Sequence, residues 1–227
     1  MIKKGIFTGL PIMLGYLPVA ITYGVLAKQA GMSLTELTLM SVLVFAGASQ
    51  FMAVNMIAVG TGAVEIIIAT FVLNFRHFVM SLSFMNQLRN FSLKWKIPLS
   101  FGLTDESFAV SSVNKDEAKM EKGALFYGTI IIIAYVSWIF GSFLGGVLGD
   151  VIPDRLSQSM GIALYAMFIG LLLPSVKKDK RIAVIALFAM LINALCIQLG
   201  MSTGWAIVVG TIIGGMSGIY LLKEEPA

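Results

Sequence analysis

Three short polar stretches interrupt an otherwise apolar sequence. They read GASQ at 47–50, NFRH at 74–77 and TDE at 104–106. A cationic side chain at the centre of a bilayer-spanning helix costs roughly 2.5 to 3.5 kcal/mol, so it usually faces a bundle interior or an aqueous cavity. We therefore expect Arg76 and His77 to lie beside a polar cavity, unless Arg76 extends towards a membrane surface.

The first two stretches suggest how a small molecule could be held. Small residues and an amide at 47–50 permit a helix break or the close approach of a ligand, although hydrogen bonding between helices is the alternative. Asn74 and His77 share one helix side, whereas residues two apart point about 200° apart. We expect either Arg76 or His77 to point away from the side that carries Asn74.

The third stretch places Asp105 and Glu106 next to each other. Two buried carboxylates repel each other, so one of them is expected to hold a proton or a cationic partner. A proton-coupled carrier would use such a pair, whereas in an exposed loop Asp105 or Thr104 would only cap a helix. The candidates for proton coupling are His77, Asp105 and Glu106, and we favour Asp105 over Glu106.

The composition indicates a membrane protein. Of the 227 residues, 58% are hydrophobic and 12% are charged, against about 25% charged residues in a soluble domain. The apolar segments leave no room for nucleic-acid modules or phosphate-binding loops, and we expect no cofactor. Cys196 is the single cysteine, which excludes a disulfide or a cysteine-based metal site within one chain.

The apolar segments predict an all-α integral membrane protein with about seven transmembrane helices in one domain, residues 1–227. We expect the first helix to be broken at Pro11, Gly15 and Pro18. Residues 98–113 are too short and polar to cross, which favours a re-entrant or broken element. The predicted crossings are 5–27, 37–62, 64–85, 124–149, 158–175, 182–200 and 204–222.

The basic residues allow two orientations. In the first orientation residues 98–113 do not cross and the N-terminus is outside, so that twelve Lys and Arg lie inside and three outside. In the second, residues 98–113 cross and the N-terminus is inside, so that ten lie inside and five outside. Arg76 is not counted in either orientation, because it lies within the membrane. Because Lys and Arg collect in cytoplasmic loops, the first orientation is favoured, with residues 1–4 outside. Both orientations place the KKDKR run at 177–181 and the C-terminus in the cytoplasm.

A weak internal similarity appears at an offset of about 117 to 119, where Gly31 falls on Gly149 and Asn74 on Asn193. It predicts repeat halves at about 5–113 and 124–222, inverted if seven helices cross. Glycines also recur every four residues, which suits packing within the chain or docking of a second subunit. These stripes are Gly141, Gly145 and Gly149, and Gly210, Gly214 and Gly218.

The motifs FAGASQF, NFRHFVMSLSF and LTDESFA, with GLPIMLGYLPVAITYG before them, resemble the AzlC family of branched-chain amino-acid permeases over essentially the whole chain. The resemblance implies a secondary transporter that exports leucine, isoleucine or valine across the bacterial inner membrane. It also implies a small hydrophobic AzlD-type subunit as partner. We expect coupling to the proton gradient.

Such a substrate needs a positive end, a negative end and an apolar pocket. Helix N-termini near Gly47 and Thr104, helped by Arg76, would hold its carboxylate, and Asp105 or exposed carbonyls would hold its ammonium. Arg76 is expected to balance either that carboxylate or Asp105. The substrate-binding candidates are Gly47, Ser49, Gln50, Asn74, Arg76, Thr104 and Asp105, with Phe45, Phe51, Met52 and Phe75 as the apolar wall.

Two other functions fit the same residues. A membrane subunit without transport activity would use its glycine stripes only to hold a partner. An intramembrane hydrolase would use Ser49 as nucleophile and His77 as base, provided that the fold brings them within hydrogen-bond reach.

Overall fold

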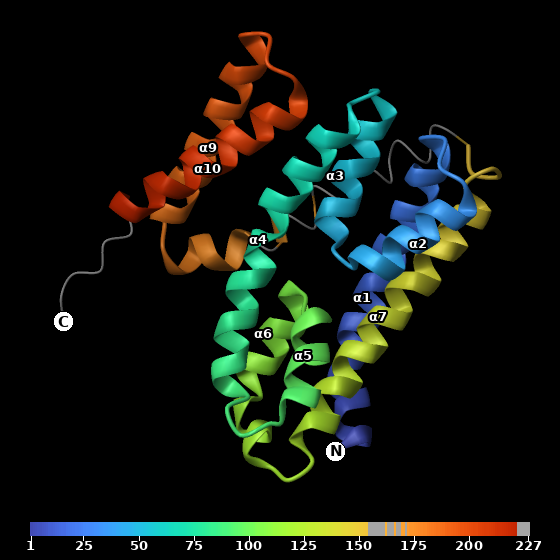
Figure 1. The fold of residues 1–227 in the computed structure, drawn as a ribbon, viewed down its shortest axis with the longest axis vertical. Coiled ribbons are helices and arrows are strands. Elements are labelled where there is room, and N and C mark those ends of the chain that lie inside the picture. The colour runs from blue at the N-terminus through green and yellow to red at the C-terminus, as the bar shows by residue number, and fades with distance from the viewer. Residues whose placement is uncertain (154–161, 163–165, 167–168, 171, 222–227) are drawn as a thin grey trace.

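The computed structural model describes residues 1–153, 162, 166, 169–170 and 172–221, and this part of the chain is helical without strands (Figure 1). Five of its helices are long and apolar enough to cross a membrane: α1 (Ile2–Gln29), α4 (Ala63–Gln87), α7 (Gly123–Leu148), α9 (Arg181–Gln198) and α10 (Thr203–Leu221). The all-α class is confirmed. Most of the predicted crossing at 158–175 lies outside the described residues.

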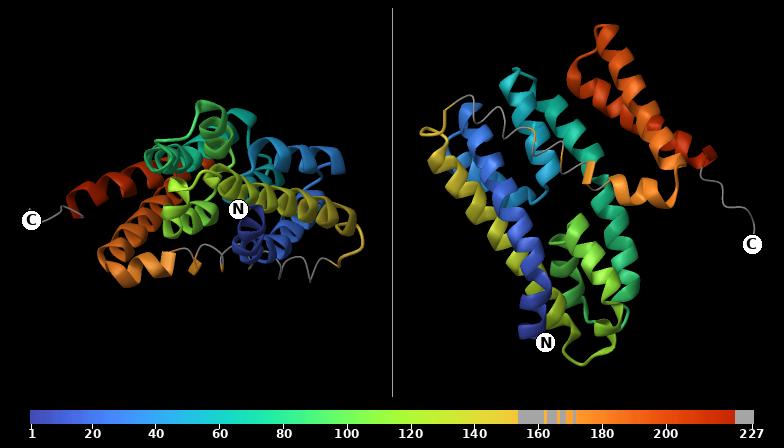
Figure 2. Two further views of the ribbon diagram at one scale, coloured as in Figure 1. Left: turned by 90° about the horizontal axis from the view of Figure 1, so that it is seen from below. Right: turned by 180° about the vertical axis from the view of Figure 1, so that it is seen from behind.

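Helices α1 and α7 lie side by side and run in the same direction (Figures 1 and 2). A Cβ atom on Gly9 would meet Ile130, and one on Gly141 would lie 2.6 Å from the Ala20 Cβ. One on Gly24 would overlap the carbonyl oxygen of Ser142. Glycines therefore permit this close parallel packing, and the stripe on α7 serves packing within the chain.

Helix α1 is continuous, so the predicted break in it is wrong. Pro11 and Pro18 lie inside the helix, and each removes one backbone hydrogen-bond donor. The Thr22 hydroxyl donates to the Pro18 carbonyl at 2.9 Å. We attribute the continuity to α7, which packs along α1 from end to end.

The segment 34–58 forms a re-entrant helical hairpin, which we call hairpin 1. It consists of α2 (Leu34–Val44) and α3 (Gly47–Ala58). The Leu37 carbonyl accepts a hydrogen bond from Tyr23, whereas Phe45 at the tip contacts Tyr16, two turns lower on α1. On the return, the Phe51 ring lies 5.8 Å from the Tyr23 ring.

Hairpin 1 corrects the sequence prediction for 37–62. The chain enters to about half the height of α1 and returns to the end at which it entered, so it does not cross. The break is at Phe45, whose φ of 40° is the one positive φ of a non-glycine residue in the described chain. The helix break that the small residues at 47–50 were expected to permit is observed beside them, between α2 and α3.

Helix α4 runs back along the molecule and leads into hairpin 2, which enters from the other end. Hairpin 2 consists of α5 (Leu93–Phe101) and α6 (Asp105–Val113), followed by the short helix η1 (Lys115–Lys119). The Gln87 amide donates to the Ser111 carbonyl at 2.9 Å. The tip reaches Tyr16, whose hydroxyl donates a hydrogen bond to Thr104 Oγ1 at 2.7 Å. The predicted re-entrant element at 98–113 is therefore confirmed.

The order of crossing helix and hairpin occurs twice in opposite directions. Helices α1 and α4 end 58 residues apart, at Gln29 and Gln87, and each is followed by a hairpin of two short helices. The repeat predicted between 5–113 and 124–222 falls partly outside the described residues and stays a prediction. The first helices of the two proposed halves, α1 and α7, run in the same direction, whereas an inverted repeat needs opposite directions. Among the described residues one crossing helix, α4, lies between them in the chain.

Helices α9 and α10 form a further hairpin beside α4. The Glu65 carboxylate at the start of α4 accepts hydrogen bonds from the Ser202 hydroxyl and the Trp205 N–H. A Cβ on Gly210 or Gly214 would meet Ala189 or Asn193 of α9. These glycines therefore pack against α9, which matches packing within the chain, the first of the two alternatives for this stripe.

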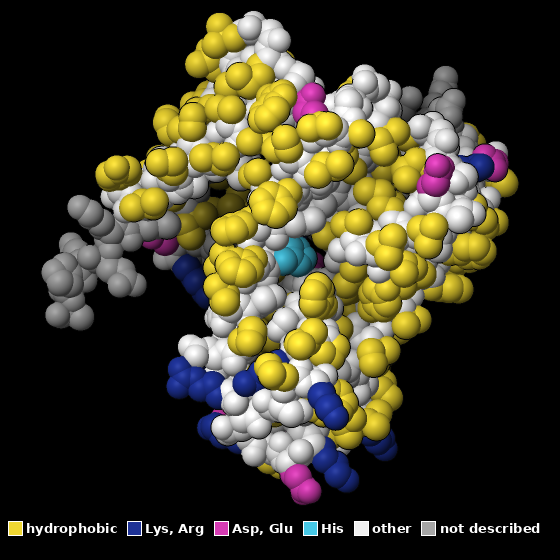
Figure 3. All heavy atoms as spheres, viewed as in Figure 1, with side chains coloured by type: hydrophobic (Ala, Val, Ile, Leu, Met, Phe, Trp, Pro, Cys, Tyr) yellow, Lys and Arg dark blue, Asp and Glu magenta, His cyan; other side chains and the backbone are white. Residues whose placement is uncertain are grey.

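The N-terminus lies at the same end as the loops that flank hairpin 2. Lys4 forms an ion pair with Glu117. The prediction that residues 1–4 lie opposite the 89–122 loop is therefore wrong, because hairpin 1 does not cross. Lys and Arg gather at this end, which we call the basic end (lower end of Figure 3); in α1 to α7 it holds Lys3, Lys4, Arg89, Lys94, Lys96, Lys115, Lys119 and Lys122, against Lys28 at the opposite end.

This topology predicts a pattern of labelling in a protein whose Cys196 has been replaced. Single cysteines at Lys4→Cys and Glu117→Cys should react with a membrane-impermeant thiol reagent from one face of the membrane. Cysteines at Gly31→Cys and Thr61→Cys, in turns at the opposite end, should react from the other face. Labelling of positions 4 and 117 from different faces would contradict the two re-entrant hairpins.

Candidate functional site

The tips of the two hairpins meet around a recess between α1, α4 and α7. The recess is a small cavity of ≈ 30 Å³ that is partly open to solvent. Figure 3 shows the only histidine, His77, at an opening in this face. The lining residues are Tyr16, Phe45, Ala46, Gly47, Ala48, Arg76, His77, Thr104, Asp105, Glu106 and Trp138.

Two helices begin at this recess, one from each hairpin. Helix α3 begins at Gly47 and α6 at Asp105. The first N–H groups of a helix have no acceptor within it, and the helix dipole adds positive potential there. A Cβ on Gly47 would lie 2.6 Å from the Trp138 ring. Glycine therefore lets the indole pack against the start of α3.

The α6 terminus already has a cap. The Thr104 hydroxyl accepts from the Ser107 N–H, and the Ser107 hydroxyl in turn accepts from the Thr104 N–H. The capping role that sequence reasoning gave Thr104 as an alternative is thus observed. Of the two termini, α3 is the one whose first N–H groups no side chain caps.

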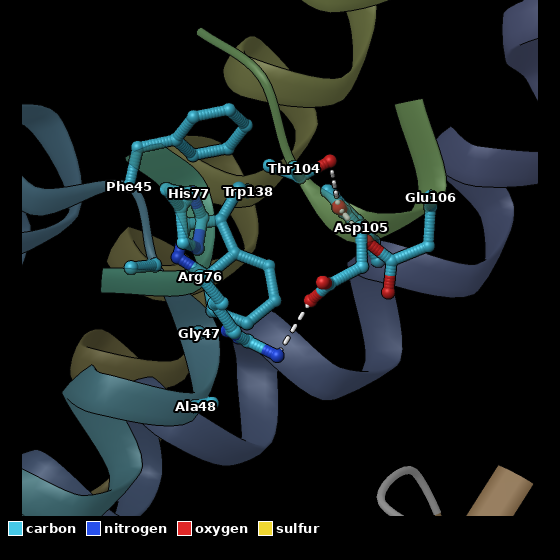
Figure 4. A pocket seen from close by; sticks show the side chains of 11 residues that line it. Phe45, Gly47, Ala48, Arg76, His77, Thr104, Asp105, Glu106 and Trp138 are labelled. Carbon is cyan, nitrogen blue, oxygen red and sulfur yellow. Dashed lines mark hydrogen bonds and ion pairs between the residues drawn. The ribbon is translucent and has the colours of Figure 1, made fainter. Parts of the chain in front are cut away.

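Arg76 and Asp105 form an ion pair across the recess (Figure 4). The Arg76 Nη1 atom lies 2.8 Å from Asp105 Oδ2, and the two side chains are 31% and 26% exposed. The pair connects the middle of α4 to the tip of hairpin 2. Arg76 Nε is buried without a hydrogen-bond partner among the described residues. The guanidinium of Arg76 is therefore only partly satisfied by Asp105.

Glu106 occupies a different environment from its neighbour. It accepts a hydrogen bond from the Tyr16 hydroxyl, which also lies 2.7 Å from Thr104 Oγ1. Within the described residues no basic side chain lies within ion-pair distance of Glu106. Asp105 is thus paired, while Glu106 carries the unbalanced charge. Sequence reasoning favoured the other carboxylate.

His77 lines the recess, and its ring forms one hydrogen bond. Its Nδ1 lies 3.0 Å from the Leu103 carbonyl oxygen. A carbonyl only accepts hydrogen bonds, so Nδ1 carries the proton and Nε2 is an acceptor in the neutral ring. Nε2 is buried without a partner among the described residues.

Both Arg76 and His77 line the recess and Asn74 does not, so the prediction that one of the two points away from the side that carries Asn74 stays a prediction. Neighbouring helix positions differ by about 100°, and the long Arg76 side chain spans that angle. Asn74 instead accepts a hydrogen bond from Ser49. Since Ser49 contacts Asn74 and His77 contacts Leu103, the described chain has no hydrogen bond between the proposed nucleophile and base.

Three predicted site residues do not line the recess. Ser49 and Asn74 join hairpin 1 to α4. Gln50 is fully buried, donates to Ser41 and accepts from the Trp138 indole at 2.8 Å. This network holds hairpin 1 against α7. Interhelical hydrogen bonding, the alternative for this stretch, therefore describes Gln50.

The predicted apolar wall is represented by Phe45. Phe51 packs against Tyr23, Met52 lies in a cluster with Met56, and Phe75 is exposed. Phe45 also borders a second, apolar groove with Phe101, Ile131 and Tyr135 among its walls. Tyr16 and Trp138 were missed because an aromatic residue in an apolar helix resembles any packing residue.

The chain is similar to known membrane proteins. The sequence model of a family described as AzlC protein matches residues 11–152. A membrane protein of Archaeoglobus fulgidus is 37% identical over 179 residues, which covers 78% of this chain and 77% of that protein.

Two relatives carry more specific names. The branched-chain amino acid transport protein AzlC of Bacillus subtilis is 26% identical over 172 residues, which covers 76% of this chain and 66% of that protein. The inner membrane protein YgaZ of Escherichia coli is 28% identical over 220 residues, 95% of this chain and 89% of its own. No solved structure matches the chain.

The recess charges predict unequal effects of single substitutions. Arg76→Gln leaves two carboxylates without a cation, whereas Asp105→Asn leaves Arg76 free to face Glu106. Breaking a pair costs from about 1 kcal/mol when exposed to roughly 3 to 5 kcal/mol when buried. Folded yield should therefore fall more for Arg76→Gln than for Asp105→Asn.

The double variant supplies the test of coupling. Arg76→Gln with Asp105→Asn restores the original net charge and should recover yield relative to Arg76→Gln alone. Fluorescence-detected size-exclusion chromatography measures the folded fraction. Arg89→Gln, at an exposed residue that contacts Asn86, is the matched control. Additive losses in the double variant would show that the two side chains do not depend on each other.

Proposed function

The chain belongs to the AzlC family, and on that premise we propose that it is a secondary transporter that exports branched-chain amino acids. Members of the family are named as branched-chain amino acid transport proteins. The substrates we propose are leucine, isoleucine, valine and similar small apolar amino acids. The energy source we propose is the proton gradient, and no catalytic step is involved.

One observation carries the proposal: hairpins from opposite ends bring a helix N-terminus, a cation and a free carboxylate to one recess. A zwitterion needs these groups at short range. Helix breaks that leave backbone groups unpaired inside a membrane are tolerated where they line a cavity, and transporters bind substrates at such breaks. A subunit that only holds a partner does not need this set of groups.

The recess suggests how the amino acid lies. The uncapped start of α3 at Gly47 and the free Arg76 Nε would bind its carboxylate. Glu106 and His77 Nε2 would accept hydrogen bonds from its ammonium. Phe45 and Trp138 would contact the aliphatic side chain. In this arrangement Asp105 balances Arg76, and Thr104 holds the tip of hairpin 2.

The distribution of basic residues supports an orientation in the inner membrane. Cytoplasmic loops carry an excess of Lys and Arg, so we place the basic end and the N-terminus in the cytoplasm. Arg181 Nη1 donates to the Leu221 carbonyl at 3.1 Å, at the end of the α9–α10 hairpin away from Glu65. The KKDKR run and the C-terminus would then also be cytoplasmic.

The partner we propose is a small hydrophobic AzlD-type membrane subunit. The support is the family resemblance together with the surfaces of α4 and α9, which are almost unburied within this chain. Phe71, Phe75 and Phe78 on α4 are exposed. These outer faces are apolar and suit contact with lipid and with another membrane-spanning chain.

Efflux from cells tests the function. Cells that express the chain, with and without the small subunit encoded beside it, are loaded with labelled leucine, isoleucine, valine or methionine. We expect the branched-chain amino acids to leave these cells faster than they leave empty-vector cells. Efflux of labelled lysine should be the same from both. Equal efflux from all cells, with the protein shown to be folded in the membrane, would contradict the proposal.

A further inference from the structure

The recess carries one excess negative charge. Arg76 contributes one positive charge, and Asp105 and Glu106 each contribute a negative one. Asp105 is paired with Arg76 at 2.8 Å. With His77 neutral, the Glu106 carboxylate remains without a cation.

The surroundings of Glu106 supply no other positive charge among the described residues. Helix α1 presents the Tyr16 hydroxyl, and α4 presents Arg76 and His77. Hairpin 1 presents Ala46, Gly47 and Ala48, and α7 presents Trp138. A partly desolvated carboxylate without a partner is unfavourable. A proton or the cationic group of a bound molecule would balance this charge.

We propose that Glu106 exchanges a proton for the ammonium group of the transported amino acid. The inference rests on the proposed function and adds to it the residue that couples the two flows. Because one carboxylate holds either the proton or the ammonium, the two bind in competition. Transport is then an exchange of amino acid for proton.

The exchange is balanced. The O–H bond of the Glu106 carboxylic acid breaks, and the proton passes to water in the open recess. The resulting carboxylate then accepts a hydrogen bond from an N–H of the incoming ammonium. When the ammonium leaves, a proton from the other side of the membrane binds the carboxylate. A higher proton concentration outside therefore favours release of amino acid to the outside, which is export.

The test measures leucine binding to the purified protein between pH 5.5 and pH 8. Competition with a single proton weakens the apparent affinity by up to about tenfold per unit fall in pH. We expect this slope for the wild type and for Glu121→Gln, the control at an exposed glutamate away from the recess. Glu106→Gln should bind leucine more weakly and without the pH slope.

Each outcome decides between the alternatives. A retained slope in Glu106→Gln overturns the proposal, and loss of the slope in His77→Gln instead assigns the proton to His77. If Glu106→Gln binds too weakly to measure, Glu106→Asp decides, because a restored carboxylate must restore binding and slope; a folded Glu106→Asp protein that does not bind overturns the proposal. Failure of the wild type to bind or transport any branched-chain amino acid would contradict the proposed function itself.

Discussion

The ion pair between Arg76 and Asp105 is the interaction on which the site depends. It connects the middle of a crossing helix to the tip of a hairpin that enters from the basic end. Without Arg76, two neighbouring carboxylates would lie without a cation in a partly buried recess, where like charges repel each other. Because Arg76 balances the charge of Asp105, the Glu106 carboxylate and the His77 ring can form hydrogen bonds with another molecule. The pair thus fixes both the position of the tip and the charge of the recess.

The apolar framework allows polar tips to exist at this depth. Glycines on α1 and α7 permit a close parallel pair, against which both hairpins rest. Trp138 connects this framework to hairpin 1, since its indole donates to Gln50 and packs against Gly47. Tyr16 does the same for hairpin 2 through Thr104 and Glu106. Helices α1 and α7 therefore each supply one side chain that holds a tip.

The sequence predicted the membrane class, the polar stretches and the re-entrant segment at 98–113, because each depends on local composition. It did not predict that 37–62 turns back, since an apolar hairpin at Phe45 has the same composition as a crossing helix. Because of that error, residues 1–4 were also placed at the wrong end relative to the 89–122 loop. The pairing of Arg76 with Asp105 is one of the two alternatives that the sequence predicted. The different surroundings of Glu106 were not predicted, because adjacent residues share their sequence context. Only the fold shows which carboxylate Arg76 reaches.

The central claim is that the tips of two hairpins from opposite ends form one amino-acid site. A structure determined by electron cryo-microscopy in a lipid environment with saturating leucine tests it most directly. The account predicts density for leucine between the start of α3 and Glu106, with its carboxylate at Gly47 and Arg76 and its ammonium at Glu106 and His77. Leucine bound elsewhere, with an empty recess between the tips, would contradict the account.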